Sequence, residues 1–414
     1  MRVLVVALAA VALAGCEKRS KLYCEKNPED LANCEPTDAM VEPPMMCTDN
    51  TSCTDAAKPF CELGAHICVE CLASTDCTRD PGAPNCDPDS FTCEGCLAHT
   101  DCASNACLPD GTCGDDATVI YVDAQGLDGN DCTSQKPCAT LARGAEVLTA
   151  TRRYIKLTGA IVGSTTLTSK RASILAGPGT TLTGTADPVL KLQMSEVKVY
   201  DLEILCGTSP AAGGVKSEMA STTTLSNVYI HGCGKIAIEA KGGFLIVQRS
   251  RIADNNDGIV TDGSAGFSIT SSIIVHNGNT GSSHGGVHIG TTVSGANRFE
   301  FNTVAHNTSK GGIGLSGGVT CPVSVTRLPA PNNLIVANSP DNTYYCEFDS
   351  SLVADDPTPM AFVNATASPY DYHIGATSTA RDNVTAASTV DEDFDGQFRP
   401  LGPAKDFGAD EFKP

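Results

Sequence analysis

The pattern Ser250-Arg251-Ile252-Ala253-Asp254-Asn255 recurs three times further along the chain, as Ser272-Ile273-Ile274-Val275-His276-Asn277, Asn302-Thr303-Val304-Ala305-His306-Asn307 and Asn333-Leu334-Ile335-Val336-Ala337-Asn338. Each copy has a Ser or Asn, an apolar residue two positions later, and an Asn three positions after that. The apolar positions are about 22, 30 and 31 residues apart. Such a period indicates a solenoid, in which each turn of the chain stacks on the previous one.

The chemistry of the repeated residues fits stacked coils. Short parallel strands about 4.8 Å apart satisfy one another's backbone donors and acceptors. β-Branched side chains pack well inside such a stack, while Asn tolerates left-handed backbone angles at a bend and can bond to the next coil. A β-sandwich also has many short strands, but it does not require Asn at one fixed offset. We therefore predict an all-β solenoid over residues 117–346, with Ile252, Ile274, Val304 and Ile335 one above another inside it.

Two further features keep step with the coils. Glycine–apolar pairs form a second column, which we expect at Gly258-Ile259, Gly286-Val287 and Gly312-Ile313. Cysteines about one coil apart predict disulfides between neighbouring turns, Cys206 with Cys233 and Cys321 with Cys346.

The start of the solenoid has its own pattern. Thr118–Val122 reads as a strand, and the loop after it contains the nearby pair Cys132 and Cys138. In residues 139–150, apolar side chains recur at helical spacing. We expect a helix there that caps the end of the strand stack, because an uncapped end would leave backbone groups unpaired.

Residues 47–116 contain a cysteine repeat. The chain has 21 cysteines, and twelve of them form three units of four: Cys47, Cys53, Cys61, Cys68; Cys71, Cys77, Cys86, Cys93; and Cys96, Cys102, Cys107, Cys113. Such short units bury little apolar surface, so two disulfides in each would supply stability, with three possible pairings. The spacing Cys68-x2-Cys71 also suits zinc, but export to an oxidising compartment favours disulfides. The region resembles the Cys-rich stalk repeats of myxobacterial-type surface proteins.

The first residues indicate export. Arg2 precedes an apolar run from Val3 to Leu13, which is too short to span a bilayer of about 30 Å. The run ends in Leu13-Ala14-Gly15-Cys16, which resembles the lipobox of bacterial lipoproteins. We expect a signal peptide at 1–15, a lipid anchor on Cys16 and a tether over 16–46. The anchored protein would reach the outer membrane or cell surface.

The charge of the chain bears on its partners. The formal net charge is −20, which repels phosphate backbones, so nucleic acid is not expected as a partner. It also disfavours a strongly anionic polysaccharide, unless Ca²⁺ bridges the two. Solubility at a cell surface would equally explain the acidity.

Three passages resemble right-handed parallel β-helix surface proteins of the pectate-lyase-like superfamily. They are the entry Ile120-Tyr121-Val122-Asp123 with Lys136-Pro137-Cys138-Ala139-Thr140-Leu141, the coil 301–313, and the closing text Asp393-x-Asp395-Gly396, Arg399-Pro400-x-Gly402 and Asp406–Phe412. The resemblance covers 118–414 and implies a right-handed parallel β-helix followed by a closing segment at 347–414. It implies no reaction, because many members are described only as surface or repeat proteins.

Enzymes of that superfamily hold Ca²⁺ on aligned carboxylates and use an Arg or Lys as base. The weak candidates for such chemistry here are Asp254, Asp257 and Asp262 with Arg249, Arg251 or Lys235. Asp254, His276 and His306 share one offset, which predicts a column of stacked side chains. Such a column either binds metal or relays protons, or it is polar filling at a bend. His284 and His288 would line a groove or lie in a solvated loop.

A possible Ca²⁺ site lies near the end of the chain. Asp391, Asp393 and Asp395 have the spacing of the first half of a calcium loop. Gly402 occupies the position of the bidentate Glu, which excludes a full EF-hand. A surface turn with capping carboxylates is the alternative.

Two functions follow from these features. The first is a non-catalytic surface protein that presents a flank of the β-helix to glycans or other surface partners. The second is a polysaccharide lyase or a related carbohydrate-active enzyme. A groove with three carboxylates close enough to bind one Ca²⁺, beside an unpaired Arg or Lys, would favour the enzyme. A flank of Ser, Thr and Asn without that cluster would favour the binding protein.

Overall fold

The computed structural model describes residues 47–77, 82–207, 210–290, 297–321, 323 and 328–413. These residues form two compact units, which divide between Glu94 and Gly95. The predicted signal peptide, the anchor Cys16 and the tether lie outside the described residues. Among the described residues, no helix is both long and apolar enough to cross a bilayer.

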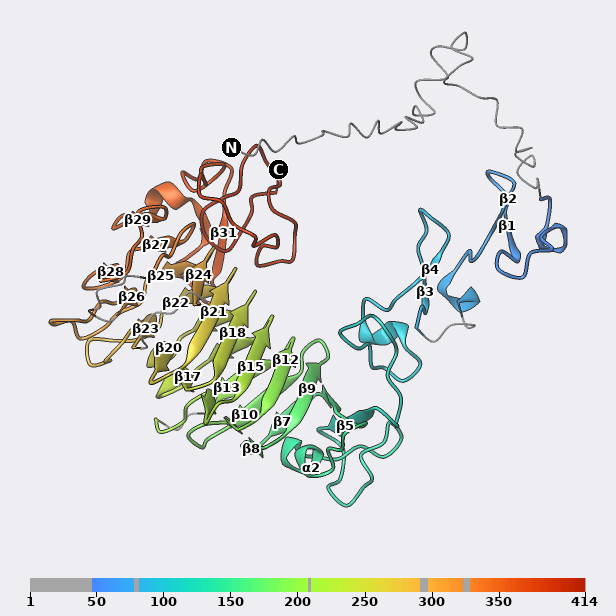
Figure 1. The fold of residues 1–414 in the computed structure, drawn as a ribbon, viewed down its shortest axis with the longest axis horizontal. Helices are drawn as coiled ribbons and strands as arrows, with labels where there is room; N and C mark the ends of the chain where they lie inside the picture. Colours follow the sequence, from blue (N-terminus) through green and yellow to red (C-terminus); the bar gives the residue numbers. More distant parts are fainter. Residues whose placement is uncertain are drawn as a thin grey trace, which may run out of the picture. The chain divides into compact units, whose positions relative to one another are not determined.

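Most of the second unit is a parallel β-helix (Figure 1). Its described strands stack coil upon coil and form three parallel sheets. Sheet 1 contains β7 (Ala160–Val162), β10 (Thr181–Gly184), β13 (Glu203–Cys206), β16 (Tyr229–His231), β19 (Arg251–Ala253), β22 (Ile273–Val275), β25 (Thr303–Ala305), β27 (Leu334–Val336) and β29 (Leu352–Ala354). Sheet 2 contains β8 (Thr165–Thr168), β11 (Leu190–Gln193), β14 (Val215–Glu218), β17 (Ile236–Lys241), β20 (Asp257–Asp262), β23 (Val287–Ile289), β26 (Val319–Thr320) and β28 (Thr343–Tyr344). Sheet 3 contains β5 (Val119–Asp123), β6 (Tyr154–Thr158), β9 (Arg171–Ala176), β12 (Glu196–Tyr200), β15 (Thr222–Ser226), β18 (Phe244–Gln248), β21 (Gly266–Thr270) and β24 (Arg298–Glu300).

The register of sheet 1 confirms the predicted apolar column. Ile252 pairs with Ile274, Ile274 with Val304, and Val304 with Ile335, and all four side chains are fully buried. Toward the N-terminal coils, the column continues through Ile230, Ile204, Leu182 and Ile161. Because successive strand residues point to opposite faces, the residues on either side of this column face outward.

Asparagine and serine side chains form two ladders at the corners that flank sheet 1. In the predicted ladder, Nδ2 of Asn277 donates to Oδ1 of Asn307 at 3.0 Å, and Nδ2 of Asn307 donates to Oδ1 of Asn338 at 2.9 Å. In the second ladder, Nδ2 of Asn302 donates to Oδ1 of Asn333 at 3.1 Å. The leading Ser or Asn of each repeat therefore has a structural role of its own.

One predicted position in the glycine–apolar column is wrong. Ile259 pairs with Val287 as expected, but Val287 then pairs with Val319, and Ile313 is fully exposed. Spacing favoured Gly312-Ile313, whereas this coil contains a longer loop, so the buried pair is Gly318-Val319. The coils also continue beyond residue 346, as far as β29.

The entry to the solenoid follows the prediction in reduced form. The helix α2 spans only Leu141–Glu146, with Thr140 as its N-cap and Leu141 and Ala145 buried. Cys132 is disulfide-bonded to Cys138, and disulfides join Cys206 to Cys233 and Cys321 to Cys346.

All three cysteine units have the same connectivity, first to third and second to fourth. The disulfides are Cys47–Cys61, Cys53–Cys68, Cys71–Cys86, Cys77–Cys93, Cys96–Cys107 and Cys102–Cys113. The first unit contains the 3₁₀ turn η1 (Asn50–Ser52) and the hairpin of β1 (Phe60–Glu62) and β2 (Ile67–Val69). The second contains η2 (Ser74–Asp76) and the pair β3 (Asn85–Cys86) and β4 (Cys93–Glu94), and the third contains η3 (His99–Asp101).

The third cysteine unit belongs to the β-helix unit, so the division falls earlier than the predicted limit at 116. Its Ala106 and Leu108 pack against Val119, Tyr121 and Leu175 of sheet 3. This apolar contact provides the physical reason for the difference.

The closing segment after β29 covers part of the outer face of sheet 1. It contains η4 (Thr358–Met360) and the antiparallel pair β30 (Phe362–Asn364) and β31 (Asp371–Ile374). Met360, Tyr372 and Ile374 share a buried cluster with outward residues of β22, β25 and β27. Figure 1 shows this segment beside β24 and β25.

Candidate functional site

The predicted column of Asp254, His276 and His306 exists, but the closing segment covers it. All three residues have left-handed backbone angles at the corner after sheet 1. The rings of His276 and His306 stack at 5.2 Å, and the Tyr370 ring stacks on His276 at 3.8 Å. The column is therefore an attachment point for the closing segment.

A hydrogen-bond chain through Tyr372 links the two histidines. Nε2 of His276 lies 3.0 Å from the carbonyl oxygen of Ala365, which can only accept, so this nitrogen carries a proton. The hydroxyl of Tyr372 lies 2.9 Å from the same nitrogen and 2.7 Å from Nδ1 of His306. Burial lowers the pKa of both histidines, which keeps the imidazoles neutral.

The other carboxylates and bases predicted from the sequence do not assemble into one site. Oδ1 of Asp257 accepts from the backbone amides of His284 and Gly285, which anchors the loop of the longest coil. Lys235 pairs with Asp187 at 2.5 Å and Arg249 with Glu392 at 3.0 Å. Asp262 caps its own turn by accepting from the amide of Gly263.

His288 of β23 and His284, in the loop before that strand, lie together. Their ring centroids are 4.2 Å apart, and Nδ1 of each is buried without a hydrogen-bond partner. Burial lowers the pKa of His288 to about 4, so this ring is neutral. Among the described residues, no third metal-ligating side chain joins this pair in a compact group.

The three aspartates of the predicted Ca²⁺ loop each have a different partner in the structure. Asp391 pairs with Lys405 at 3.4 Å. Asp393 is fully buried and accepts from the backbone amides of Gln397 and Glu411, and Asp395 accepts from His373. Only the carboxylate of Asp393 therefore holds backbone, whereas those of Asp391 and Asp395 hold side chains.

A different group in the closing segment has ligand atoms within 4.8 Å of one another, namely His373, Asp395 and Asp410. Burial raises the pKa of Asp410 to about 6. Arg251 lies nearby, between the rings of Tyr229 and Phe394, each 5.7 Å from its guanidinium carbon. Nε2 of His373 is held by Asp395 at 2.9 Å.

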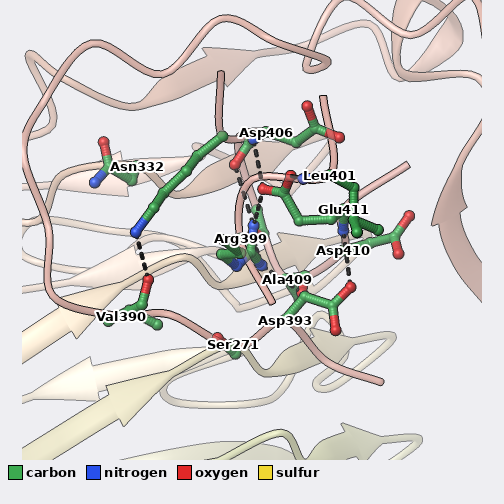
Figure 2. Close-up of polar contacts among 12 residues, drawn as sticks. Ser271, Asn332, Val390, Asp393, Arg399, Leu401, Asp406, Ala409, Asp410 and Glu411 are labelled. Atoms are coloured by element: carbon green, nitrogen blue, oxygen red, sulfur yellow. Dashed lines mark hydrogen bonds and ion pairs between the residues drawn. The ribbon is translucent and has the colours of Figure 1, made fainter. Parts of the chain in front are cut away.

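The closing motif forms a buried ionic network (Figure 2). The side chain of Arg399 is fully buried and donates to Glu411 at 2.7 Å and to the carbonyl oxygens of Gly408 and Ala409 at 2.9 and 2.6 Å. Its guanidinium also lies over the ring of Phe301, 4.4 Å from the centroid. The amide of Ala409 donates to Thr303 of β25, so the network joins the closing segment to sheet 1. The closing motif therefore has a structural role.

Sheet 3 presents an open polar flank that the sequence did not single out. The register places one outward column across its strands, consisting of Tyr154, Ser173, Lys198, Thr224, Ile246, Ser268 and Arg298. A second column beside it consists of Tyr200, Ser226, Gln248, Thr270 and Glu300. We call these two columns the polar flank; its central residues, on β15, β18 and β21, are uncharged.

A cavity lies at each end of the polar flank. The cavity at the N-terminal coils, which we call the lower cavity, has a volume of about 380 Å³. It lies beside Pro109 and Asp110 of the third cysteine unit and strands β6, β9 and β12. The upper one, of about 420 Å³, is bounded by β18, β21, β24 and residues 389–392 of the closing segment. The alternation of polar and apolar residues in β12 and β15 signalled an outward polar face. Only the register shows which of these residues are neighbours.

Sheet 2 differs from the polar flank because its outward charges neutralise one another. Lys191 pairs with Glu218 at 2.9 Å, Lys216 with Glu239 at 2.9 Å, and Lys241 with Glu239 at 2.7 Å. These side chains are therefore already occupied by intramolecular partners.

Comparisons with known proteins agree with the architecture. Residues 179–328 match a family model described as a right handed beta helix region. A crystal structure of pectate lyase Pel9A has a TM-score of 0.38 and 12% identity, covering 72% of this chain and 96% of that one. A rhamnogalacturonan lyase has a TM-score of 0.25 and 14% identity, covering 57% and 84%. No curated protein matches the chain.

At these identities and TM-scores, the two solved structures carry no argument about what this chain does. The family match and the strand pairing together establish the architecture. The chain contains a right-handed parallel β-helix preceded by disulfide-rich units.

Proposed function

We propose that this protein is a non-catalytic, cell-surface glycan-binding lipoprotein that binds its ligand along the polar flank of sheet 3. The observation that carries the proposal is the set of uncharged outward side chains across β15, β18 and β21, hydroxyl and amide groups beside the apolar Ile246, between two cavities. Sugar hydroxyls form hydrogen bonds with such groups. The ladder of strands repeats at about 4.8 Å, which suits an extended chain of similar units.

The anchoring and location are part of the same proposal. The lipobox-like text at Cys16 would fix the protein to the outer membrane or cell surface. The nine described disulfides support an oxidising, exported environment. Globomycin treatment tests the anchor: an unprocessed precursor should accumulate, whereas unchanged processing would contradict lipidation.

A substitution that blocks the flank tests the binding. Thr224→Trp places a large ring at the centre of the polar flank, and Thr166→Trp places the same ring on the outer face of sheet 2 as a control. On a panel of neutral and acidic glycans, we expect Thr224→Trp to weaken binding at least tenfold, or about 1.4 kcal/mol. Thr166→Trp should bind like the wild type. Equal binding by both variants, or no glycan bound by the wild type, would overturn the proposal.

A polysaccharide lyase is the second candidate, favoured by the group of His373, Asp395 and Asp410 beside Arg251. There the carboxylates would hold Ca²⁺ and Arg251 would remove a proton. The test is the ultraviolet absorbance of unsaturated sugars after incubation with the same panel, with and without Ca²⁺. Ca²⁺-dependent product that disappears in both Asp410→Asn and Arg251→Ala would establish the lyase and refute the non-catalytic function.

A further inference from the structure

The lower cavity has cations on three successive coils. Arg153 precedes β6, Arg171 begins β9, and Lys198 lies in β12. All three side chains are exposed. Because Arg171 lies 18 positions after Arg153 and Lys198 lies 27 positions after Arg171, the sequence does not show that the three form one cluster.

Two of these cations have no ion-pair partner in the described part of the chain. Arg171 pairs with Glu196 at 2.5 Å, but neither Arg153 nor Lys198 lies within ion-pair distance of a carboxylate. The pKa of Asp110, at the same cavity, is lowered chiefly by its hydrogen bonds to Thr112, and the charge of Arg153 is the smallest of the contributions. This contrasts with sheet 2, where Lys191, Lys216 and Lys241 are all paired.

Half-buried tyrosine rings line the same cavity. Tyr154 and Tyr200 pack against the apolar cluster between the third cysteine unit and sheet 3, which fixes their positions. Ser173 pairs with Tyr154 on one side and with Lys198 on the other. An aromatic face, a hydroxyl and a cation thus stand on three adjacent strands, each about 4.8 Å from the next.

We propose that the lower cavity binds a sugar residue bearing an anionic group, a carboxylate or a sulfate ester, with Arg153 and Lys198 as its counter-charges. The inference rests on the proposed function and names the ligand class of one end of the polar flank. A sugar ring in this position lies against Tyr200, while the anionic group meets Lys198 and Arg153, which form no ion pair with a described residue. The guanidinium of Arg153 lies over the ring of Tyr154, its carbon 5.6 Å from the ring centroid. Because the whole chain has a net charge of −20, long-range attraction does not explain such binding, and short-range contacts in the cavity must supply it.

The test compares polymers with the same backbone. Dextran is neutral, carboxymethyl dextran carries carboxylates and dextran sulfate carries sulfate esters. We expect at least one anionic polymer to bind the full chain tenfold or more tightly than dextran, and binding to weaken as salt rises. Whether carboxymethyl dextran or dextran sulfate binds more tightly distinguishes carboxylate recognition from sulfate recognition.

Charge-matched variants locate the site. Arg153→Gln with Lys198→Gln should abolish the preference for the anionic polymer. Arg143→Gln with Lys191→Gln removes two positive charges on α2 and sheet 2 and should leave the preference intact. No preference in the wild type, or an equal loss in both double variants, overturns the inference. If the Arg153/Lys198 variant still binds a panel glycan in a Thr224→Trp-sensitive manner, the proposed function stands without this cavity.

Discussion

Asn277→Ala tests whether the side-chain ladder stabilises the solenoid. The side chain of Asn277 is fully buried, and its Nδ2 lies 2.9, 3.1 and 3.0 Å from Ile252 O, Val275 O and Asn307 Oδ1. Its Oδ1 accepts from the backbone amide of Asn255 at 3.3 Å and from Nδ2 of Asn255 at 2.9 Å. The substitution leaves the buried backbone amide of Asn255 without its acceptor, at a cost of about 1–3 kcal/mol. It also removes the other hydrogen bonds of the Asn277 side chain, worth about 1 kcal/mol each. We therefore expect the free energy of unfolding to fall by about 3 kcal/mol.

Guanidinium-induced unfolding followed by circular dichroism measures this loss, because the chain has no Trp for fluorescence. The midpoint should fall while the slope stays unchanged, since the same surface is exposed on unfolding. Asn383→Ala is the matched control, because Asn383 makes a single exposed hydrogen bond, 2.9 Å from the carbonyl oxygen of Thr379, and should change stability by less than about 0.5 kcal/mol. A loss for Asn277→Ala no larger than that of the control would refute the role assigned to the ladder.

Three further outcomes follow from buried groups. Arg399→Leu should lower the free energy of unfolding by about 3–5 kcal/mol, because it leaves the buried Glu411 without its ion-pair partner. The double variant Arg399→Leu with Glu411→Leu should lose less, and equal losses in denaturant unfolding would contradict the pairing. Burial lowers the pKa values of His276 and His306 in the folded protein below the ordinary value of about 6.5, so the unfolded chain binds more protons and stability should fall as pH drops below about 6.5. Urea midpoints at about pH 7.5 and 5.5 should differ less in His306→Gln, and an undiminished difference would count against this cause. Cys206→Ser with Cys233→Ser should lower thermal stability by about 2–4 kcal/mol, and an unchanged melting temperature would show that the link between coils contributes nothing.

The sequence predicted the solenoid because its repeat fixes side-chain direction. An apolar residue followed three positions later by Asn fits one corner of one coil, and four copies leave little freedom in register. Where a coil has a longer loop, the same reasoning fails, as for Ile313, because spacing alone does not show which glycine–apolar pair returns to the stack. The correct residue, Val319, is fully buried.

The candidate sites were less predictable because they depend on what covers each face. Asp254, His276 and His306 share an offset, and the structure does stack them. Their environment comes from Tyr370 and Tyr372, which no local pattern connects to them. The cations of the lower cavity were missed for a similar reason, because each lies on a different coil.

The distribution of buried and paired groups restricts where an extended ligand can lie. On the upper part of sheet 1, a ligand would have to displace Tyr372, which is almost fully buried and hydrogen-bonded to both histidines. On sheet 2, it would have to compete with ion pairs such as Lys216–Glu239. Across β15, β18 and β21, the described strand residues form no ion pair, and residues 389–392 of the closing segment border only the end of this region next to β24, so over the rest a ligand would displace mainly water. The closing segment therefore leaves sheet 3 as the face on which binding requires the least disruption of existing contacts.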